Sequence, residues 1–188
     1  MERKCEGQEM TKIPFRAKLD GKVAVVTGGG GVLCSRFARA LAACGAKVAL
    51  LGRSEPPLNK VSALISDEGG EAVVVTADVT DKSSLIGAHD TIMSKLGPCD
   101  ILINGAGGNR PDATTGCEYF GGEGKSFFEL DEEAIRSVFD LNFTGTLLAT
   151  QVFACDMTGR GGTVINISSM NAFRPLTKIP AYSAAKSA

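Results

Sequence analysis

Short apolar runs alternate with stretches of helical spacing along most of this chain. The runs are Val23–Val26, Val48–Leu51, Ala72–Val75, Ile101–Ile103 and Val164–Ile167. Each run has the length and composition of a buried parallel strand. The first three begin about 25 residues apart, which leaves room for a helix to return the chain parallel to itself. The alternation therefore predicts an α/β fold, a doubly wound parallel sheet in three layers.

Three of the intervening stretches carry apolar residues at helical spacing. These residues are Leu33, Phe37 and Leu41, then Leu58, Val61, Leu64 and Ile65, then Leu85, Ile86, Ile92, Met93 and Leu96. A fourth helix is predicted to begin near Asp131 and to continue through Phe139, since residues 131–133 are acidic and would lie at its amino end. The 26 residues from Gly105 to Leu130 show no clear period, and we interpret them as a substrate-side loop.

The length of 188 residues indicates one domain, here residues 21–188, preceded by a polar extension, residues 1–20. The extension contains no apolar run long enough for a signal peptide or membrane span, so we expect a cytoplasmic protein with no membrane partner. The chain has 20 Lys and Arg against 21 Asp and Glu, a net charge of −1. This balance argues against a nucleic-acid partner.

Cysteine and histidine usage limits the possible chemistry. Six cysteines, at positions 5, 34, 44, 99, 117 and 155, include no close pair, as expected for reduced thiols. Because His89 is the single histidine, a metal site built on histidines and a Ser-His catalytic arrangement are both nearly excluded. We therefore predict no metal.

A glycine-rich turn follows the first predicted strand. Thr27 is followed by Gly28, Gly29, Gly30 and Gly31, and then by Val32 and Leu33 at the start of a predicted helix. Glycines permit close backbone approach, and a helix start offers free amides to a pyrophosphate. A glycine run can also be only a flexible turn. In this strand–turn–helix context we expect it to bind a nucleotide.

Two further strand ends carry candidate cofactor residues. Arg53 stands after the second strand, where dinucleotide-binding domains often carry an acidic residue for the ribose hydroxyls. It can pair with a 2′-phosphate, which slightly favours NADP over NAD, although arginine also stacks on adenine or faces solvent. After the third strand, Asp78 is the better candidate for the adenine, since Asp81 can simply cap the predicted helix Lys82–Lys95.

The last segment places Tyr182 and Lys186 four residues apart, on one face of a predicted helix. A free tyrosine is a poor acid or base at neutral pH, and a nearby ammonium favours the phenolate. Ser169 closes the predicted strand from Thr163 to Ser168, so its hydroxyl would reach the ligand crevice and bond a reacting carbonyl oxygen.

These features in this order resemble the short-chain dehydrogenase/reductase family. The resemblance runs from about Lys22 to the last residue and is carried by Thr27-Gly28, Asp78, Asn104-Gly105-Ala106-Gly107, Asn142, Ser169 and Tyr182-x-x-x-Lys186. It implies that Tyr182 is the general acid or base, that Lys186 tunes Tyr182 and holds the nicotinamide ribose, and that Ser169 orients the substrate oxygen. The cofactor-binding residues it implies are Thr27, Gly28, Gly30, Gly31, Val32, Leu33, Arg53, Asp78, Val79, Asn104, Ala106, Gly107, Tyr182 and Lys186.

The family's remaining polar positions have less direct roles. Asn142 is similar to the residue that supports a proton-relay water, and the alternative is a buried amide bonded to backbone. Asn104 resembles the residue that stabilises the central sheet. The sequence departs from the family pattern in two places, the glycine turn and the residue after Asn104. Val32 and Cys34 occupy the later glycines of the turn, and Gly105 stands where many members have a second Asn.

The substrate loops resemble the mannonate or fructuronate reductases of the family, through residues 104–115 and 168–177. A sugar acid carries a carboxylate, for which Arg110 or Arg174 is a suitable bidentate partner, and Asn171 lies in the same loops. Exposed loops are nevertheless the commoner place for an arginine.

The resemblance implies an NAD(P)-dependent oxidoreductase that moves a hydride between nicotinamide and a carbonyl or secondary alcohol. Family members are generally longer, so we expect the carboxyl-terminal part of the sheet to be incomplete. A non-catalytic nucleotide-binding module and an inactive fragment are the alternatives. Family members commonly assemble through helices such as the one predicted in residues 131–157, so a homo-oligomer, dimer or tetramer, is expected.

Overall fold

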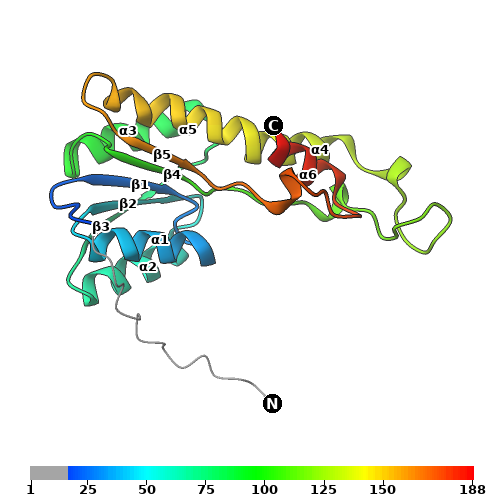
Figure 1. Cartoon of the computed structure of the whole chain (residues 1–188), viewed down its shortest axis with the longest axis horizontal. Helices are drawn as coiled ribbons and strands as arrows, with labels where there is room; N and C mark the ends of the chain where they lie inside the picture. Colours follow the sequence, from blue (N-terminus) through cyan, green and yellow to red (C-terminus); the bar gives the residue numbers. More distant parts are fainter. Residues whose placement is uncertain (1–16) are drawn as a thin grey trace, which may run out of the picture.

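The computed structural model describes residues 17–188, which form one parallel sheet between two helical layers (Figure 1). The strands are β1 (Val23–Thr27), β2 (Lys47–Gly52), β3 (Glu71–Thr76), β4 (Ile101–Asn104) and β5 (Thr163–Asn166). Their order is β3-β2-β1-β4-β5, with every neighbouring pair parallel. The chain reverses its direction of winding between β1 and β4, and ligands bind at this point in such sheets. The predicted doubly wound fold is confirmed.

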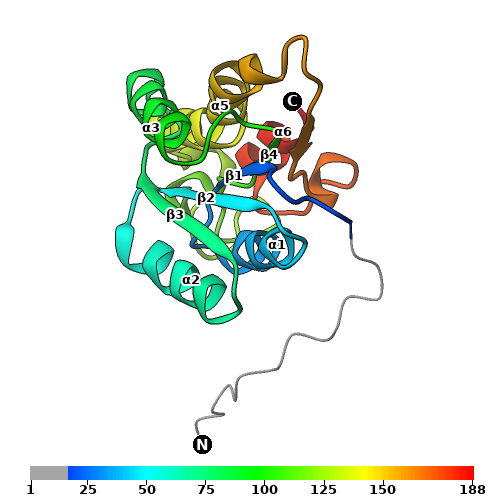
Figure 2. The same cartoon turned by 90° about the vertical axis from the view of Figure 1, so that its left-hand side faces the viewer.

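Helices cover both faces of the sheet (Figure 2). One layer contains α1 (Val32–Ala43) and α2 (Glu55–Asp67), and the other contains α3 (Lys82–Lys95) and α5 (Gly145–Phe153). Strand residues alternate between the two resulting cores: Val26 and Leu50 pack beneath α1 and α2, whereas Val25 and Leu51 pack beneath α3 and α5. Continuous apolar strands are thus explained by burial on both faces.

The predicted fourth helix is part of a longer helical rod. α4 (Glu132–Phe139) begins where expected, capped by the Asp131 carboxylate, which accepts a hydrogen bond from the Ala134 amide at 2.7 Å. The rod continues through a π-helical turn, η3 (Asp140–Thr144), into α5 and the 3-10 turn η4 (Ala154–Met157). The π turn shifts the helical register, and it carries Asn142 at its buried side.

Residues 105–130 extend beyond the end of the sheet (Figure 1). They contain two short 3-10 helices, η1 (Pro111–Ala113) and η2 (Phe127–Glu129). The Thr115 amide donates to the Lys178 carbonyl at 2.8 Å, which ties this segment to the chain before α6 (Pro180–Ser187). A further 3-10 turn, η5 (Met170–Ala172), precedes α6 and packs against it.

The sheet ends at β5, whose four residues are all exposed. β5 closes at Asn166, so the prediction that Ser169 closes a strand from Thr163 to Ser168 is wrong. Ser169 instead begins η5, where its hydroxyl accepts a hydrogen bond from the Asn171 amide at 3.2 Å. A side chain that bonds its own backbone two residues on favours a turn over a continued strand.

The predicted amino-terminal extension falls mainly on residues 1–16, which lie outside the described residues. Of its remainder, Leu19 packs against the core beneath α1 and donates its amide to the Cys44 carbonyl at 2.9 Å. Within residues 17–188, no helix has both the length and the apolar character needed to cross a membrane. The five cysteines in this range are all free thiols.

Candidate active site

A cleft of about 470 Å³ opens at the carboxyl ends of β1, β2 and β4. Its walls come from the turn after β1, the turn after β2 and the loop after β4. The lining residues are Gly28, Gly30, Gly31, Val32, Leu33, Cys34, Gly52, Arg53, Ser54, Pro57, Leu58, Gly105, Ala106, Gly107 and Ile167. The cleft therefore brings most of the predicted cofactor residues together.

The glycine turn after β1 is built for close backbone approach. Gly28 has a φ of +68°, and a Cβ there would lie 3.0 Å from the Gly105 and Ala106 backbone. A Cβ on Gly30 would lie 2.9 Å from Pro57. No side chain caps α1 at Gly31, so the first amides of the helix remain available to an anion. These observations fit the pyrophosphate of a dinucleotide.

Thr27 fastens the loop after β4 to the end of β1. Its buried hydroxyl accepts hydrogen bonds from the Gly105 amide at 3.0 Å and the Ala106 amide at 3.1 Å. Asn104 performs a similar task further along the sheet, since its side-chain amide donates to Thr150 Oγ1 and Asn166 Oδ1, each at 2.8 Å. These contacts join β4, β5 and α5, as a sheet-stabilising residue should.

Cys34 and Gly105 occupy one space. The buried Cys34 sulfur lies against the Gly105 backbone, so a Cβ at position 105 would overlap it. The departures at Cys34 and Gly105 are therefore coupled by packing, whereas Val32 is exposed and takes no part in it. A larger residue in the helix is accommodated by a smaller residue in the facing loop.

The turn after β2 forms the part of the cleft expected to hold the adenosine, whereas Asp78, after β3, lies outside the residues that line the cleft. Arg53 is exposed on the cleft wall. The Asp78 carboxylate accepts from the Thr80 amide at 2.9 Å and the Thr80 hydroxyl at 2.8 Å. The pKa of Asp78 is lowered, mainly by the hydrogen bond from the Thr80 amide. Burial raises this pKa, whereas the Thr80 hydroxyl and the charge of Arg53 lower it further. Val79 is buried in the core, so only its backbone can face a ligand.

Asn142, Lys186 and Gly107 meet at the other end. A Cβ on Gly107 would lie 2.7 Å from Asn142 Oδ1 and 3.3 Å from Lys186 Nζ, so glycine leaves room for both side chains. Asn142 donates to the Gly108 and Val138 carbonyls at 2.7 and 2.8 Å and accepts from the Gly108 amide at 3.1 Å. These bonds support the backbone-bonded alternative, and a relay role for Asn142 stays a prediction.

Lys186 reaches this cluster from α6, and Tyr182, one turn earlier on the same helix, is partly buried against the apolar cluster between α4 and α6. The Lys186 ammonium donates to the Ile167 carbonyl at 2.9 Å and lies 5.9 Å from the centre of the Tyr182 ring. Burial lowers the pKa of Lys186. The Ser187 hydroxyl donates to the Ala172 carbonyl at 3.1 Å, which holds α6 against the turn that begins at Ser169. The backbone carbonyl of Ile167 therefore holds the Lys186 ammonium in place. Ile167 was not among the predicted site residues, because a contact made by a backbone carbonyl leaves no signal in the residue types.

The predicted substrate residues lie apart from the cleft lining. Arg110 and Arg174 are exposed on loops. Asn171 is buried, and its side-chain oxygen accepts from the Leu176 amide at 3.3 Å. Asn171 therefore shapes the loop after η5, and a direct contact with substrate stays a prediction for all three residues.

The family model of the short chain dehydrogenases matches residues 22–188. The chain belongs to this family. Its glycine turn and the Tyr182–Lys186 helix both lie within the match, and the cleft beside the turn lies where the winding of the sheet reverses, the point at which such folds bind dinucleotides.

Several proteins described as oxidoreductases are similar to this chain. An uncharacterized oxidoreductase of Bacillus subtilis, UxuB, is 50% identical over 177 residues, 93% of this chain and 64% of the relative. An uncharacterized oxidoreductase of Haemophilus influenzae is 48% identical over 90% of this chain and 61% of the relative. The chain thus spans less than two thirds of the length of these relatives.

Solved structures agree with the fold. A Haemophilus protein named as a candidate D-mannonate oxidoreductase, solved with bound NAD, superposes with a TM-score of 0.88 at 48% identity, over 90% of this chain and 62% of that one. An NAD⁺-bound xylitol dehydrogenase superposes with a TM-score of 0.80 at 27% identity, over 91% of this chain and 62% of that one.

Proposed function

We propose that this protein is a nicotinamide-dependent oxidoreductase that interconverts a carbonyl group and a secondary alcohol. The observation that carries the proposal is the placement of Tyr182 and Lys186 on one helix face, with the Lys186 ammonium against Gly107 at the end of the dinucleotide cleft. A protein that only binds a nucleotide has no need of a phenol beside an ammonium at this point.

The residues around the cleft fit a dinucleotide. The uncapped start of α1 and the glycine turn would hold the pyrophosphate, and Thr27 and Asn104 fix the loop that would face the nicotinamide. When bound, the cofactor supplies or accepts the hydride. The Tyr182 hydroxyl donates a proton to the substrate oxygen in reduction and accepts it in oxidation, while the Ser169 hydroxyl orients that oxygen. The Lys186 ammonium stabilises the phenolate that remains.

Arg53 supports NADP as the preferred cofactor. Its guanidinium is exposed on the cleft wall, and no acidic residue stands at the end of β2, residues 52–54, to bond the ribose hydroxyls. The Haemophilus relative binds NAD, so the two cofactors must be compared directly. We expect Arg53→Ala to weaken NADPH binding at least about tenfold and to change NADH binding little, because only NADPH carries the 2′-phosphate.

The control for this experiment is Arg36→Ala, which removes one exposed positive charge from α1 outside the cleft lining. Titration of intrinsic cofactor fluorescence gives both dissociation constants. An equal loss of NADPH affinity in the two variants would show that overall charge, rather than Arg53, sets the preference.

A sugar acid such as fructuronate or mannonate is the proposed substrate. The resemblance of the loops 104–115 and 168–177 supports it, and so does the similarity to the Haemophilus candidate D-mannonate oxidoreductase. Arg110 and Arg174, on these two loops, are the candidates for a bidentate contact with the carboxylate. A homo-oligomer formed through the rod of α4 and α5 is also proposed, supported by the exposed side chains of Phe143 and Leu147.

The assay that tests the function follows the absorbance of NADH and NADPH with fructuronate and with a panel of neutral ketones. We expect oxidation of a reduced cofactor with fructuronate and weaker activity with ketones that lack a carboxylate. Tight cofactor binding with no oxidation would favour the non-catalytic module. Aggregation, or unfolding without cooperativity, would favour an inactive fragment.

A further inference from the structure

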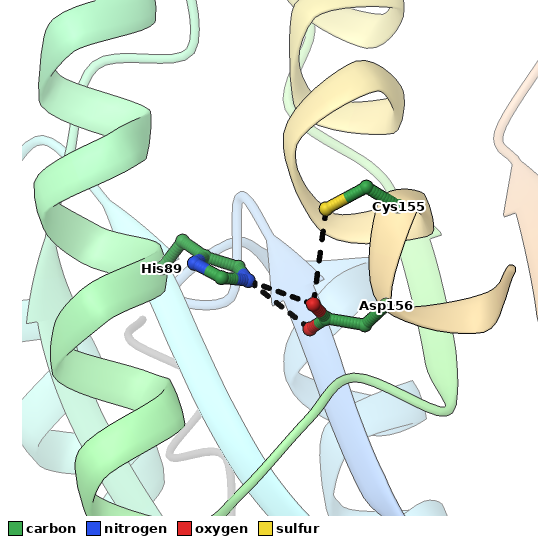
Figure 3. Close-up of side chains that lie close together, drawn as sticks. All are labelled: His89, Cys155 and Asp156. Carbon is green, nitrogen blue, oxygen red and sulfur yellow. Dashed lines mark hydrogen bonds and ion pairs between the residues drawn. The ribbon is translucent and has the colours of Figure 1, made fainter.

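Three side chains of different chemistry converge between α3 and η4 (Figure 3). His89 comes from α3, whereas Cys155 and Asp156 come from η4 at the end of the helical rod. His89 Nε2 lies 3.0 and 3.1 Å from the two Asp156 carboxylate oxygens, and Cys155 Sγ lies 3.8 Å from Asp156 Oδ1. One potential ligand atom from each of the three residues lies within 4.8 Å of the other two.

Both nitrogens of His89 face carboxylates. Nε2 faces Asp156, and Nδ1 lies 3.6 Å from Asp90 Oδ1. A neutral imidazole carries one proton and can therefore donate to only one of them. A cation on Nε2 places the proton on Nδ1, on the side of Asp90, whose side chain is 75% exposed and lies beyond hydrogen-bond distance. Asp156 is therefore the carboxylate that the His89 ring contacts directly.

Asp156 is also positioned as a ligand would be. Its side chain is 9% exposed, and Oδ2 accepts a hydrogen bond from the Cys99 amide at 2.9 Å, which fixes the carboxylate while Oδ1 faces Cys155. Arg160 donates to the Asp156 backbone carbonyl and to the Asp100 carboxylate, so it leaves the Asp156 carboxylate to the cluster.

The hydrogen-bonded state of the same cluster is the competing arrangement. In it, Nε2–H donates to Asp156 and the Cys155 thiol donates to the Val152 carbonyl at 2.9 Å. Cys155 is exposed, so a cation from solvent can reach the thiol.

We propose that His89, Cys155 and Asp156 form a binding site for Zn²⁺. Imidazole, thiolate and carboxylate are the three ligand types that zinc accepts, and a water molecule would complete the tetrahedron. On binding, the Cys155 thiol releases one proton to solvent and the imidazole proton moves from Nε2 to Nδ1. The site requires one histidine only, so the sequence argument against a histidine-based site does not apply to it.

Metal binding at this site would affect the stability of the fold. The site joins α3 to η4 on the face of the sheet that α3 and α5 cover, and it stands at the sheet edge away from the cleft. Zinc should therefore stabilise the fold by binding the native state, without contacting the cofactor.

The test uses the reduced full chain, Co²⁺ as a spectroscopic substitute and Zn²⁺ as its competitor. We expect one equivalent of Co²⁺ to produce a thiolate charge-transfer band in the near ultraviolet and the visible bands of a tetrahedral site, and Zn²⁺ to abolish both. Cys155→Ser and His89→Gln should lose the charge-transfer band, while the control Cys117→Ser should keep it. Zn²⁺ should also raise Tm in the unmodified protein and in the control only.

Circular dichroism confirms that each variant is folded, and Cys155→Ala replaces Cys155→Ser if the serine variant is not. A charge-transfer band that persists in both the Cys155 and the His89 variants would overturn the proposal. So would a folded, reduced wild-type chain that binds Co²⁺ without any such band. Neither result depends on dehydrogenase activity.

Discussion

At the scale of single residues, Cys34 and Gly105 show how two departures from a family pattern can be a single adaptation. The thiol of Cys34 occupies the space that a side chain at position 105 would need. The sequence alone does not show that these two residues are in contact, because they are far apart along the chain. The pairing depends on the packing of α1 against the loop after β4, which a linear pattern does not contain.

This coupling predicts the outcome of a double-mutant cycle. Gly105→Asn should destabilise the chain by about 1–3 kcal/mol through overpacking and weaken dinucleotide binding. Cys34→Gly should cost about 1 kcal/mol, because glycine weakens a helix. The double variant should recover much of the stability that Gly105→Asn loses, because the Cys34 sulfur no longer occupies the space that the new side chain needs. Urea unfolding and cofactor titration measure both effects, and simple addition of the two single changes would show that the sites are independent.

At the scale of the elements, Asp100 ties the start of β4 to two other segments, the start of β1 and the turn after η4. Its carboxylate accepts from the Val23 amide at 3.0 Å, from Lys22 Nζ at 3.2 Å and from Arg160 Nη2 at 3.0 Å. Burial raises the pKa of Asp100, but the Val23 amide and the two cations together outweigh it, so the pKa is lowered. A carboxylate whose pKa is lower in the folded state stabilises the fold above the unfolded pKa, and this contribution is lost as the pH falls through the folded value.

We therefore expect Asp100→Asn to reduce the free energy of unfolding by about 1–3 kcal/mol at neutral pH. The difference from the unmodified chain should shrink as the pH falls below the ordinary aspartate pKa of about 3.8. Asp112→Asn is the matched control, because Asp112 pairs with Lys125 at an exposed site and should change stability by less than about 1 kcal/mol. Equal losses in the two variants at neutral pH would contradict the assigned role of Asp100.

Most element boundaries could be predicted from the sequence, and the exceptions have physical causes. The helix Lys82–Lys95 was predicted to the residue, since Asp81 caps it through the Ser83 amide at 2.8 Å. The π turn at Asp140–Thr144 was not, because one extra residue within a helical rod barely changes the apolar period. Ser169 was assigned to a strand because its bond to the Asn171 amide is invisible in a hydrophobic pattern.

At the scale of the whole molecule, β5 is an edge strand of the sheet, and its residues are exposed. Val164 and Ile165 are 38% and 44% exposed, which is unusual for a strand of a doubly wound sheet. Exposed edges favour association with another strand. We expect the 188-residue chain to self-associate as its concentration rises, and Ile165→Lys to reduce that association, as measured by sedimentation velocity.

The control for charge is Ser66→Lys, which adds the same cation on the exposed surface of α2. Association that is reduced equally by both substitutions would assign the effect to net charge and not to the β5 edge.

The candidate site is also a property of the whole molecule, because it joins segments from both ends of the chain. The sequence indicated which residue types take part, and the parallel topology explains why the turns after β1, β2 and β4 meet. The carbonyl of Ile167, the anchor of Lys186, and the backbone bonds of Asn142 could not be predicted, because they depend on where η5 and the π turn place the main chain.

The most direct measurement of the catalytic claim compares turnover and cofactor affinity in Tyr182→Phe and in the unmodified protein. The account predicts a loss of turnover of about 10²–10⁴-fold or more, because the proton donor is removed, with the dissociation constant of the reduced cofactor nearly unchanged. Turnover that stays close to that of the unmodified protein, with the cofactor still bound, would contradict the assignment of Tyr182 as the acid and base.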